Sequence, residues 1–359
     1  MTAEPGRWRL GHRPALDGLR GLAVALVVAA HVTIPYMGGG VIGVDIFFVL
    51  SGFLITALLL EEESGTGRVD LLAFYRRRAL RLFPALALLL PVVAIAANVS
   101  PEIDKTTAGL TTRAIPWVVG YAANWGRALG TQMGLFGHTW SLAIEEQFYL
   151  LWPFILLALL GKNRRYGRVI IVSIAVVFVV AVYRAFEWSA GAGVDRVANG
   201  TDMRADSLLV GCAIAVGLHR GLSLRPPPVV VALAVGFLAY VIATQGPFSG
   251  FLYLGGLTCV ALAAGVIILA LLESPWLLDH RPLVLTGRIS YGIYLWHFPI
   301  VFLVPLSWPV FVRAPVVVAL TVLIAALSWF LLEQRFLRLK PQRTTRGTAA
   351  AAPMGDRAV

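Results

Sequence analysis

Long runs of apolar residues follow one another along this chain, and they constrain its fold more than any other feature. Each run is hydrophobic all round rather than along one stripe, which is the pattern of helices surrounded by lipid or by other helices. Because 58% of the residues are hydrophobic and only 14% are charged, the chain is too apolar for a soluble domain of this size. We predict an all-α, polytopic integral membrane protein with about ten transmembrane helices, near residues 15–35, 40–61, 71–98, 139–160, 167–186, 203–219, 228–245, 250–272, 283–305 and 312–333.

The basic residues predict how these spans are oriented. A formal net charge of +11 is compatible with nucleic-acid binding, but here the basic residues stand in short clusters between apolar runs, which is typical of membrane topology signals. One weaker apolar stretch, 107–125, is interrupted by Arg113, Pro116 and Asn124. If this stretch does not cross the membrane, nearly all basic clusters lie on the same side of the membrane. The positive-inside rule then places both termini in the cytoplasm and residues 99–138 outside.

Composition also divides the chain into regions. Residues 1–12 and 339–359 are polar, and we expect them to be disordered cytoplasmic tails on either side of a membrane domain at 13–338. This organisation predicts a multi-pass protein of the cell (inner or plasma) membrane, in contact with membrane lipid and without a nucleic-acid partner. Cys212 and Cys259 lie inside apolar runs and lack CxxC spacing, and we expect no metal site and no tightly bound cofactor.

Arg20 and His31 both lie in the first predicted helix, where ionisable side chains are unfavourable in lipid. They are eleven positions apart, which at about 100° per residue brings both to one face, roughly 16 Å apart along the axis. Arg20 is therefore expected near the cytoplasmic surface and His31 in the outer half of the membrane. Both then face a polar interior. In the alternative, Arg20 reaches the interface and a backbone carbonyl satisfies His31.

Three carboxylates are candidates for orienting His31. Asp45 begins the second predicted helix at a depth similar to that of His31, where a carboxylate would fix the tautomer of the imidazole and support it as a base. Glu145 and Glu146 lie inside the fourth predicted span at a matching depth. They point about 100° apart, so only one is expected to face the site. The alternative for a glutamate is an ion pair with a buried arginine of the fifth or sixth span.

Other polar residues stand where a substrate could bind. In the ninth predicted span, Ser290, Tyr294 and His297 share one helix face, which either lines a path for a substrate or forms a hydrogen-bonded packing seam. His138 and Trp140 stand at the outer entrance of the fourth span. These five are candidate substrate-binding residues.

Two further arginines mark the inner end of the third span. Arg78 and Arg81 are three residues apart and hence on one helix face. A guanidinium group matches the geometry of phosphate oxygens. Because Arg20 is expected at the same depth, three cations converge at the cytoplasmic mouth of the bundle. They predict a binding site for a phosphate-bearing donor from the cytosol.

Taken in chain order, these pieces resemble the acyltransferase-3 family of bacterial membrane-bound O-acyltransferases over about residues 13–336. The matching pieces read RPALDGLRG at 13–21 with His31 after it, GVDIFFVLSGF at 43–53, RALRLFP at 78–84, WSLAIEEQFY at 140–149 and SYGIYLWH at 290–297. The resemblance implies transfer of an acyl group, usually acetyl from acetyl-CoA, to a hydroxyl group of a carbohydrate or secondary metabolite. It also implies a catalytic His31, with the acyl-CoA co-substrate held by Arg20, Arg78 and Arg81.

We therefore predict a membrane O-acyltransferase in which acyl-CoA binds from the cytoplasm. His31, oriented by Asp45, Glu145 or Glu146, removes the proton of the acceptor hydroxyl, and a covalent acyl-histidine is the variant mechanism. Some family members carry a soluble hydrolase-like domain after the last span. None is expected here, so any later transfer step would fall to the membrane domain or to a partner.

The alternative function is a transporter or flippase of an acyl or glycan carrier. Transporters of this size commonly show internal repeats, whereas the histidine, the arginine pair and the glutamates each occur once here. The acceptor is left open among a cell-wall glycan, an exported polysaccharide and an antibiotic, and so is the length of the acyl chain.

Overall fold

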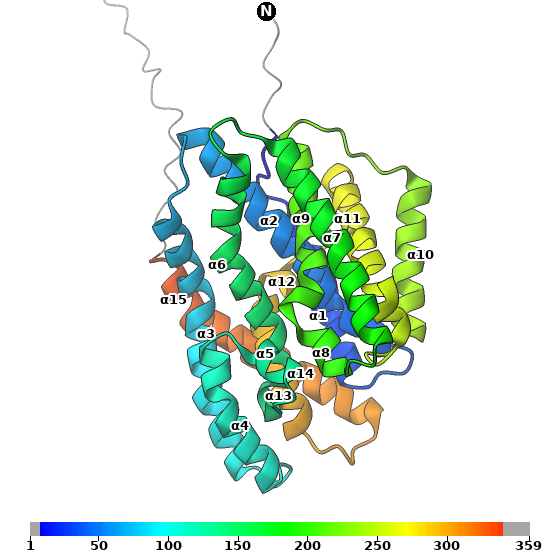
Figure 1. Ribbon diagram of the computed structural model, residues 1–359. Helices are drawn as coiled ribbons and strands as arrows, with labels where there is room; N and C mark the ends of the chain where they lie inside the picture. The colour runs from blue at the N-terminus through cyan, green and yellow to red at the C-terminus, as the bar shows by residue number, and fades with distance from the viewer. Residues whose placement is uncertain (1–7, 340–359) are drawn as a thin grey trace, which may run out of the picture.

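The computed structural model describes residues 8–339, and every regular element in that range is a helix. This confirms the all-α prediction. The long helices form a bundle with α1 in its middle (Figure 1). They are α1 (Pro14–His31), α2 (Gly43–Thr66), α3 (Leu71–Val99), α6 (Trp140–Leu160), α7 (Tyr166–Ser189), α9 (Thr201–His219), α10 (Pro228–Thr244), α11 (Leu257–Glu273), α13 (Ser290–Leu303) and α14 (Val310–Ser328).

Shorter elements connect these helices. The short α-helices are α4 (Lys105–Val119), α5 (Ala123–Ala128), α8 (Val194–Asn199), α12 (Arg281–Arg288) and α15 (Gln334–Leu337). The 3₁₀ turns are η1 (Gly38–Ile42), η2 (Gly134–Thr139) and η4 (Pro275–Leu277), and the π-helical turns are η3 (Leu252–Gly256) and η5 (Trp329–Glu333).

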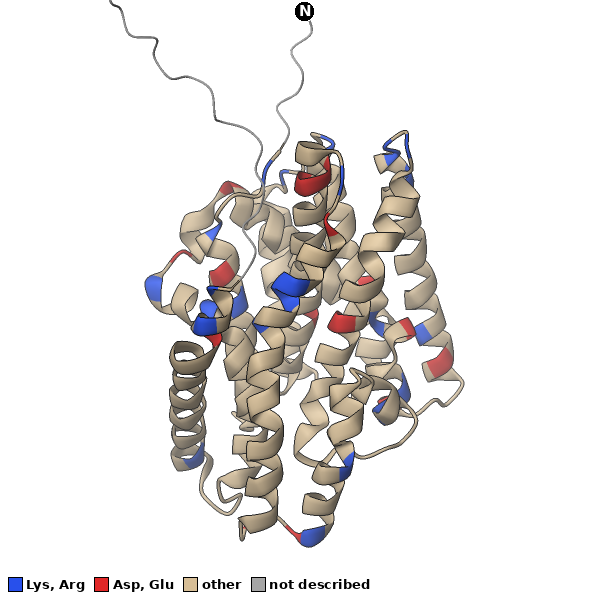
Figure 2. Ribbon diagram, turned by 90° about the vertical axis from the view of Figure 1, so that its left-hand side faces the viewer, with Lys and Arg blue, Asp and Glu red and all other residues tan. Residues whose placement is uncertain are grey.

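Each predicted span overlaps one of the long helices. Seven helical segments within 8–339 are long and apolar enough to cross a membrane, and α10 and α13 are shorter apolar helices. The remaining long helix, α9, carries charged residues near its start. Charged residues lie at both ends of the bundle and, in smaller patches, on helix turns between them (Figure 2). The fold is thus a multi-pass membrane bundle, while the total of ten spans and the orientation of the termini stay predictions.

The weaker apolar stretch folds as α4 and α5. The 15 residues of α4 rise about 22 Å, which is less than the roughly 30 Å of a hydrocarbon core. α4 lies beside α3 at the end of the molecule far from the N-terminal segment (Figure 1). This arrangement agrees with the expectation that 107–125 is not a span of its own.

Two glycines let α2 and α9 pack with their backbones in contact. A Cβ added at Gly52 would lie 1.9 Å from the carbonyl oxygen of Leu208, and one added at Gly211 would lie 2.0 Å from that of Val49. Small residues at such contacts are typical of helix pairs in membranes. Because the two helices meet here, polar side chains two turns earlier on each are brought within reach of one another.

The first helix ends at His31 rather than near residue 35. Thr33 and Tyr36 have φ values of 62° and 59°, in the left-handed region, and Pro35 lies between them. Residues in this conformation cannot continue an α-helix. His31 therefore stands at the end of α1, half-buried, directly before an exposed turn.

Part of the predicted N-terminal tail contacts the bundle. The ring of Trp8 packs edge-on against Phe53 at 6.0 Å, and the buried Leu10 donates its backbone N–H to Glu61. The remainder of the two predicted tails, 1–7 and 340–359, lies outside the described residues.

We expect residues 161–168 to be cytoplasmic and residues 99–138 to be extracytoplasmic, because the arginine distribution requires it. The test introduces Lys162→Cys or Glu102→Cys, both at exposed positions, after the exposed Cys259 has been changed to serine. An impermeant maleimide added to intact cells should label the cysteine introduced at 102 and leave the one at 162 unlabelled. The reverse pattern would overturn the predicted orientation.

Candidate functional site

A cavity of about 170 Å³ lies inside the bundle and is lined from α1, α2, α3, α6 and α13. It collects residues that are far apart in the sequence, and most of its polar lining was predicted from the motifs. The polar lining residues are Arg20, Ser51, Arg78, Arg81, Tyr121, Ser141, Glu145, Glu146, Tyr149, Ser290, Tyr291 and Tyr294.

The three predicted arginines all line this cavity. Arg20 comes from α1 and Arg78 and Arg81 from α3, and within the described residues none of them forms a salt bridge. The guanidinium carbon of Arg78 lies 3.3 Å from the centre of the Tyr149 ring, a cation–π contact. The Nε of Arg78 is buried without a hydrogen-bond partner in residues 8–339. Because the three guanidinium groups form no salt bridge in residues 8–339, they are able to bind an anionic ligand.

Both glutamates line the same cavity, so the expectation that only one faces the site is wrong. Ser51 donates a hydrogen bond of 2.6 Å to Glu145, and the hydroxyl of Tyr149 donates one of 2.7 Å to Ser51. Glu146 has no hydrogen bond or ion pair to a described residue. Ser51 and Tyr149 were not predicted from the sequence, although Tyr149 follows Glu145 by four positions and thus shares its helix face.

Three histidines form a second grouping. The ring centre of His297 lies 5.1 Å from that of His31 and 5.6 Å from that of His138. Phe298 packs against His31 at 5.3 Å and against His138 at 5.0 Å. His138 and His297 are buried, whereas His31 is half-buried at the end of α1. We call His31, His138 and His297 the histidine cluster. Among the described residues, no group of three or more His, Cys, Asp or Glu is arranged to hold a metal ion.

The tautomer of His31 is set by its own helix. Its Nδ1 lies 2.8 Å from the carbonyl oxygen of Val27. A carbonyl only accepts hydrogen bonds, so Nδ1 carries the proton and Nε2 keeps a free lone pair in the neutral ring. A backbone carbonyl thus satisfies His31, as one of the two sequence interpretations allowed. It also leaves Nε2 able to accept a proton.

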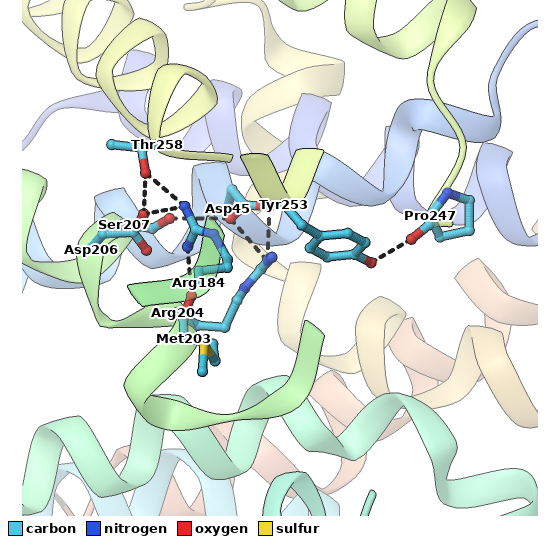
Figure 3. Close-up of polar contacts among 9 residues, drawn as sticks. All are labelled: Asp45, Arg184, Met203, Arg204, Asp206, Ser207, Pro247, Tyr253 and Thr258. Carbon is cyan, nitrogen blue, oxygen red and sulfur yellow. Dashed lines mark hydrogen bonds and ion pairs between the residues drawn. The ribbon is translucent and has the colours of Figure 1, made fainter. Parts of the chain in front are cut away.

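Asp45 does not orient His31 in this structure. Its carboxylate accepts hydrogen bonds of 2.9 and 3.0 Å from Arg204 and one of 3.1 Å from Ser207, both on α9 (Figure 3). Asp45 is 1% exposed and Arg204 5% exposed. A carboxylate this deep requires a cationic partner, and the close approach of α2 and α9 supplies Arg204.

A second buried ion pair lies beside the first. Arg184 on α7 bonds to Asp206 on α9 at 2.9 Å, and Thr258 on α11 bonds to both residues (Figure 3). The buried arginines of the fifth and sixth spans therefore pair with aspartates and not with a glutamate, which leaves Glu145 and Glu146 to the cavity.

Four of the five candidate substrate-binding residues belong to one of the two groupings. Ser290 and Tyr294 line the cavity, and the buried Oγ of Ser290 has no hydrogen-bond partner in the described part of the chain. His138 and His297 belong to the histidine cluster. Trp140 is not among the residues that line the cavity, because its ring packs 5.4 Å from the guanidinium carbon of Arg204. Trp140 thus contacts the Asp45–Arg204 ion pair.

Known proteins match this chain over nearly its whole length. Residues 13–333 match the family described as an acyltransferase domain. A peptidoglycan O-acetyltransferase of Listeria monocytogenes is 36% identical in an alignment that covers 91% of this chain and 56% of the relative. An O-acetyltransferase of Staphylococcus aureus is 34% identical, over 89% of this chain and 56% of that protein. No solved structure matches the chain.

The chain thus spans a little over half the length of these relatives. The matched region contains the arginines and glutamates of the cavity and all three members of the histidine cluster. Its helices form the multi-pass bundle that the motifs predicted. This chain belongs to the acyltransferase-3 family of bacterial membrane-bound O-acyltransferases.

Proposed function

We propose that this protein transfers an acetyl group from cytosolic acyl-CoA to a hydroxyl group of a cell-wall glycan, with peptidoglycan as the acceptor. The observation that carries the proposal is the cavity lined by Arg20, Arg78 and Arg81, none of which forms a salt bridge to a described residue. The two relatives are O-acetyltransferases, one of them a peptidoglycan O-acetyltransferase, which supports the acetyl group and the acceptor.

The donor would bind through its phosphates. Phosphate groups form bidentate, charge-assisted hydrogen bonds with guanidinium groups, and three such groups line the cavity. The buried Ser290 hydroxyl and two tyrosines of α13 line the same cavity and supply further hydrogen-bonding groups. These are the groups that an extended polar ligand with an anionic head would use.

His31 would act as the base. Its Nε2 takes the proton of the acceptor hydroxyl while the hydroxyl oxygen attacks the carbonyl carbon of the thioester. The carbon–sulfur bond then breaks, and the proton held by His31 passes to the leaving CoA sulfur, so the products are the acetylated acceptor and CoA thiol. The position of His31 beside an exposed turn leaves its ring accessible to an acceptor from that end of the bundle.

Proteoliposomes of known orientation test this proposal. Labelled acetyl-CoA is sealed on the side of the N-terminus, and a soluble peptidoglycan fragment that cannot cross the membrane is placed on the other side. The label should appear in the fragment. If transfer occurs only when donor and acceptor are on the same side, the acetyl group does not cross the membrane within the protein. Absence of both transfer and acetyl-CoA binding would overturn the proposal itself.

Changing Arg78 or Arg81 to alanine should raise the KM for acetyl-CoA more than the KM for the acceptor. Each lost charge-assisted hydrogen bond costs about 1.5–3 kcal/mol, which is roughly ten- to over a hundredfold in binding. Steady-state kinetics on purified protein gives both constants. The control is Arg76→Ala, because Arg76 belongs to the same basic run but is exposed and does not line the cavity. If Arg76→Ala raised the KM for acetyl-CoA equally, the weaker donor binding would be due to the change in net charge and not to the loss of a cavity arginine.

A further inference from the structure

The cavity and the histidine cluster are neighbours, but His31 is not among the residues that line the cavity. Tyr294 contacts both. It lines the cavity, and its ring centre lies 5.4 Å from that of His297 and 5.7 Å from that of His138. In this structure, a ligand that enters beside the arginines therefore meets Tyr294 before it can reach the histidines.

The side chain of Tyr294 is held by partners on α2, η2 and α6. Its hydroxyl donates a hydrogen bond of 3.0 Å to the backbone carbonyl of His138 and is hydrogen-bonded to Ser141, at the start of α6. Phe47 of α2 contacts the ring edge-on at 6.5 Å. The backbone carbonyl of Tyr294 in turn accepts a hydrogen bond of 2.7 Å from Nδ1 of His297. The position of the ring is thus defined by Phe47 on α2, His138 in η2 and Ser141 on α6.

We infer that Tyr294 is a partition between the arginine cavity and the histidine cluster. A ligand bound at the arginines reaches His31 only when the Tyr294 ring turns aside, which breaks its hydrogen bonds to η2 and α6. Where the ligand is taken to be acyl-CoA, this inference rests on the proposed function. The partition itself is a property of the fold, because it follows from the lining residues and the ring contacts.

The partition has a chemical consequence for an acyl donor. Water that reached a thioester in the cavity from the histidine side would attack its carbonyl carbon. The carbon–sulfur bond would break, and the products would be the free acid and CoA thiol. A closed ring at position 294 keeps that water out until the acceptor is in place. Tyr294 would therefore determine how much donor is lost to hydrolysis for each acyl group transferred.

Cysteine accessibility tests the partition without relying on activity. Ser290→Cys reports on the cavity, in a protein whose exposed Cys259 is changed to serine. An impermeant anionic methanethiosulfonate is added to either side of oriented vesicles. With Tyr294 present, labelling at 290 should occur only from the side of the N-terminus. With Tyr294→Ala, it should occur from both sides. Labelling from both sides with Tyr294 present, or no change with Tyr294→Ala, would overturn the inference.

Two further variants separate opening from general disruption. Tyr291→Ala removes a tyrosine of the same helix that also lines the cavity, but whose hydroxyl bonds to Leu82 on α3. It should leave labelling one-sided. Tyr294→Phe keeps the ring and loses the hydrogen bonds, so labelling from the histidine side should be slower than with Tyr294→Ala. If Tyr291→Ala opens the far side equally, the effect is loosened packing, and Tyr294 has no special role.

Acetyl-CoA turnover then separates this inference from the proposed function. Without acceptor, Tyr294→Ala should release more acetate per CoA bound than the unchanged protein, and its ratio of hydrolysis to transfer should rise. If neither the unchanged protein nor any variant turns over acetyl-CoA, but Tyr294→Ala is labelled from both sides as expected, the acyl-CoA proposal fails and the partition stands. If turnover is normal and the labelling does not change, the partition fails and the acyltransferase stands.

Discussion

Replacing His31 with alanine should abolish acyl transfer while the protein still folds and still binds acetyl-CoA. The loss of a general base typically costs on the order of 10²–10⁴ in rate. His31 is half-buried at a helix end, where its ring contacts His297 and Phe298. Its removal therefore leaves no closed cavity in a tightly packed core. The effect should appear in kcat with the donor affinity unchanged, which is the opposite of the pattern for the arginine variants.

The measurement is turnover of purified protein, with acetyl-CoA binding followed separately. His280→Ala is the control, because this histidine is exposed and precedes α12 outside both groupings. If His31→Ala retains more than about a tenth of the turnover, the base is another residue. His297, whose buried Nε2 has no hydrogen-bond partner in the described residues, would then be the next to test.

Replacing Arg204 with methionine should destabilise the protein by about 3–5 kcal/mol, because it leaves the Asp45 carboxylate buried without a cation. The contact of Arg204 with Trp140 would be lost as well. Unfolding in detergent, followed by tryptophan fluorescence, gives the change in free energy. Combining Arg204→Met with Asp45→Asn should recover much of the loss, since the uncompensated charge is then removed.

An exposed ion pair provides the matched control. Arg225 and Glu273 are 73% and 48% exposed at the side chain and lie 3.3 Å apart. Arg225→Met should therefore cost at most about 1 kcal/mol. Equal losses for the two arginine variants would mean that the Asp45–Arg204 pair is not shielded from water and contributes no more than a surface pair.

The sequence alone determined the class of the protein and the meeting of three arginines in one cavity. An apolar run that lies in lipid must be helical, because every backbone polar group has to be hydrogen-bonded within the segment. Each predicted span accordingly overlaps a helix. Arg20, Arg78 and Arg81 converge as predicted, because helical periodicity and the ends of the apolar runs together define the depth and the face of each side chain.

Only the tertiary structure decided which side chains touch. Asp45 was correctly expected to be deep, but its partner is Arg204, 159 positions away, and not His31. His297 and His31 meet although they come from the ninth and first predicted spans. Periodicity gives the height and the face of a residue on its own helix, whereas it says nothing about which helix lies opposite that face. That choice is made by close packing at residues such as Gly52 and by the need of a buried charge for a partner.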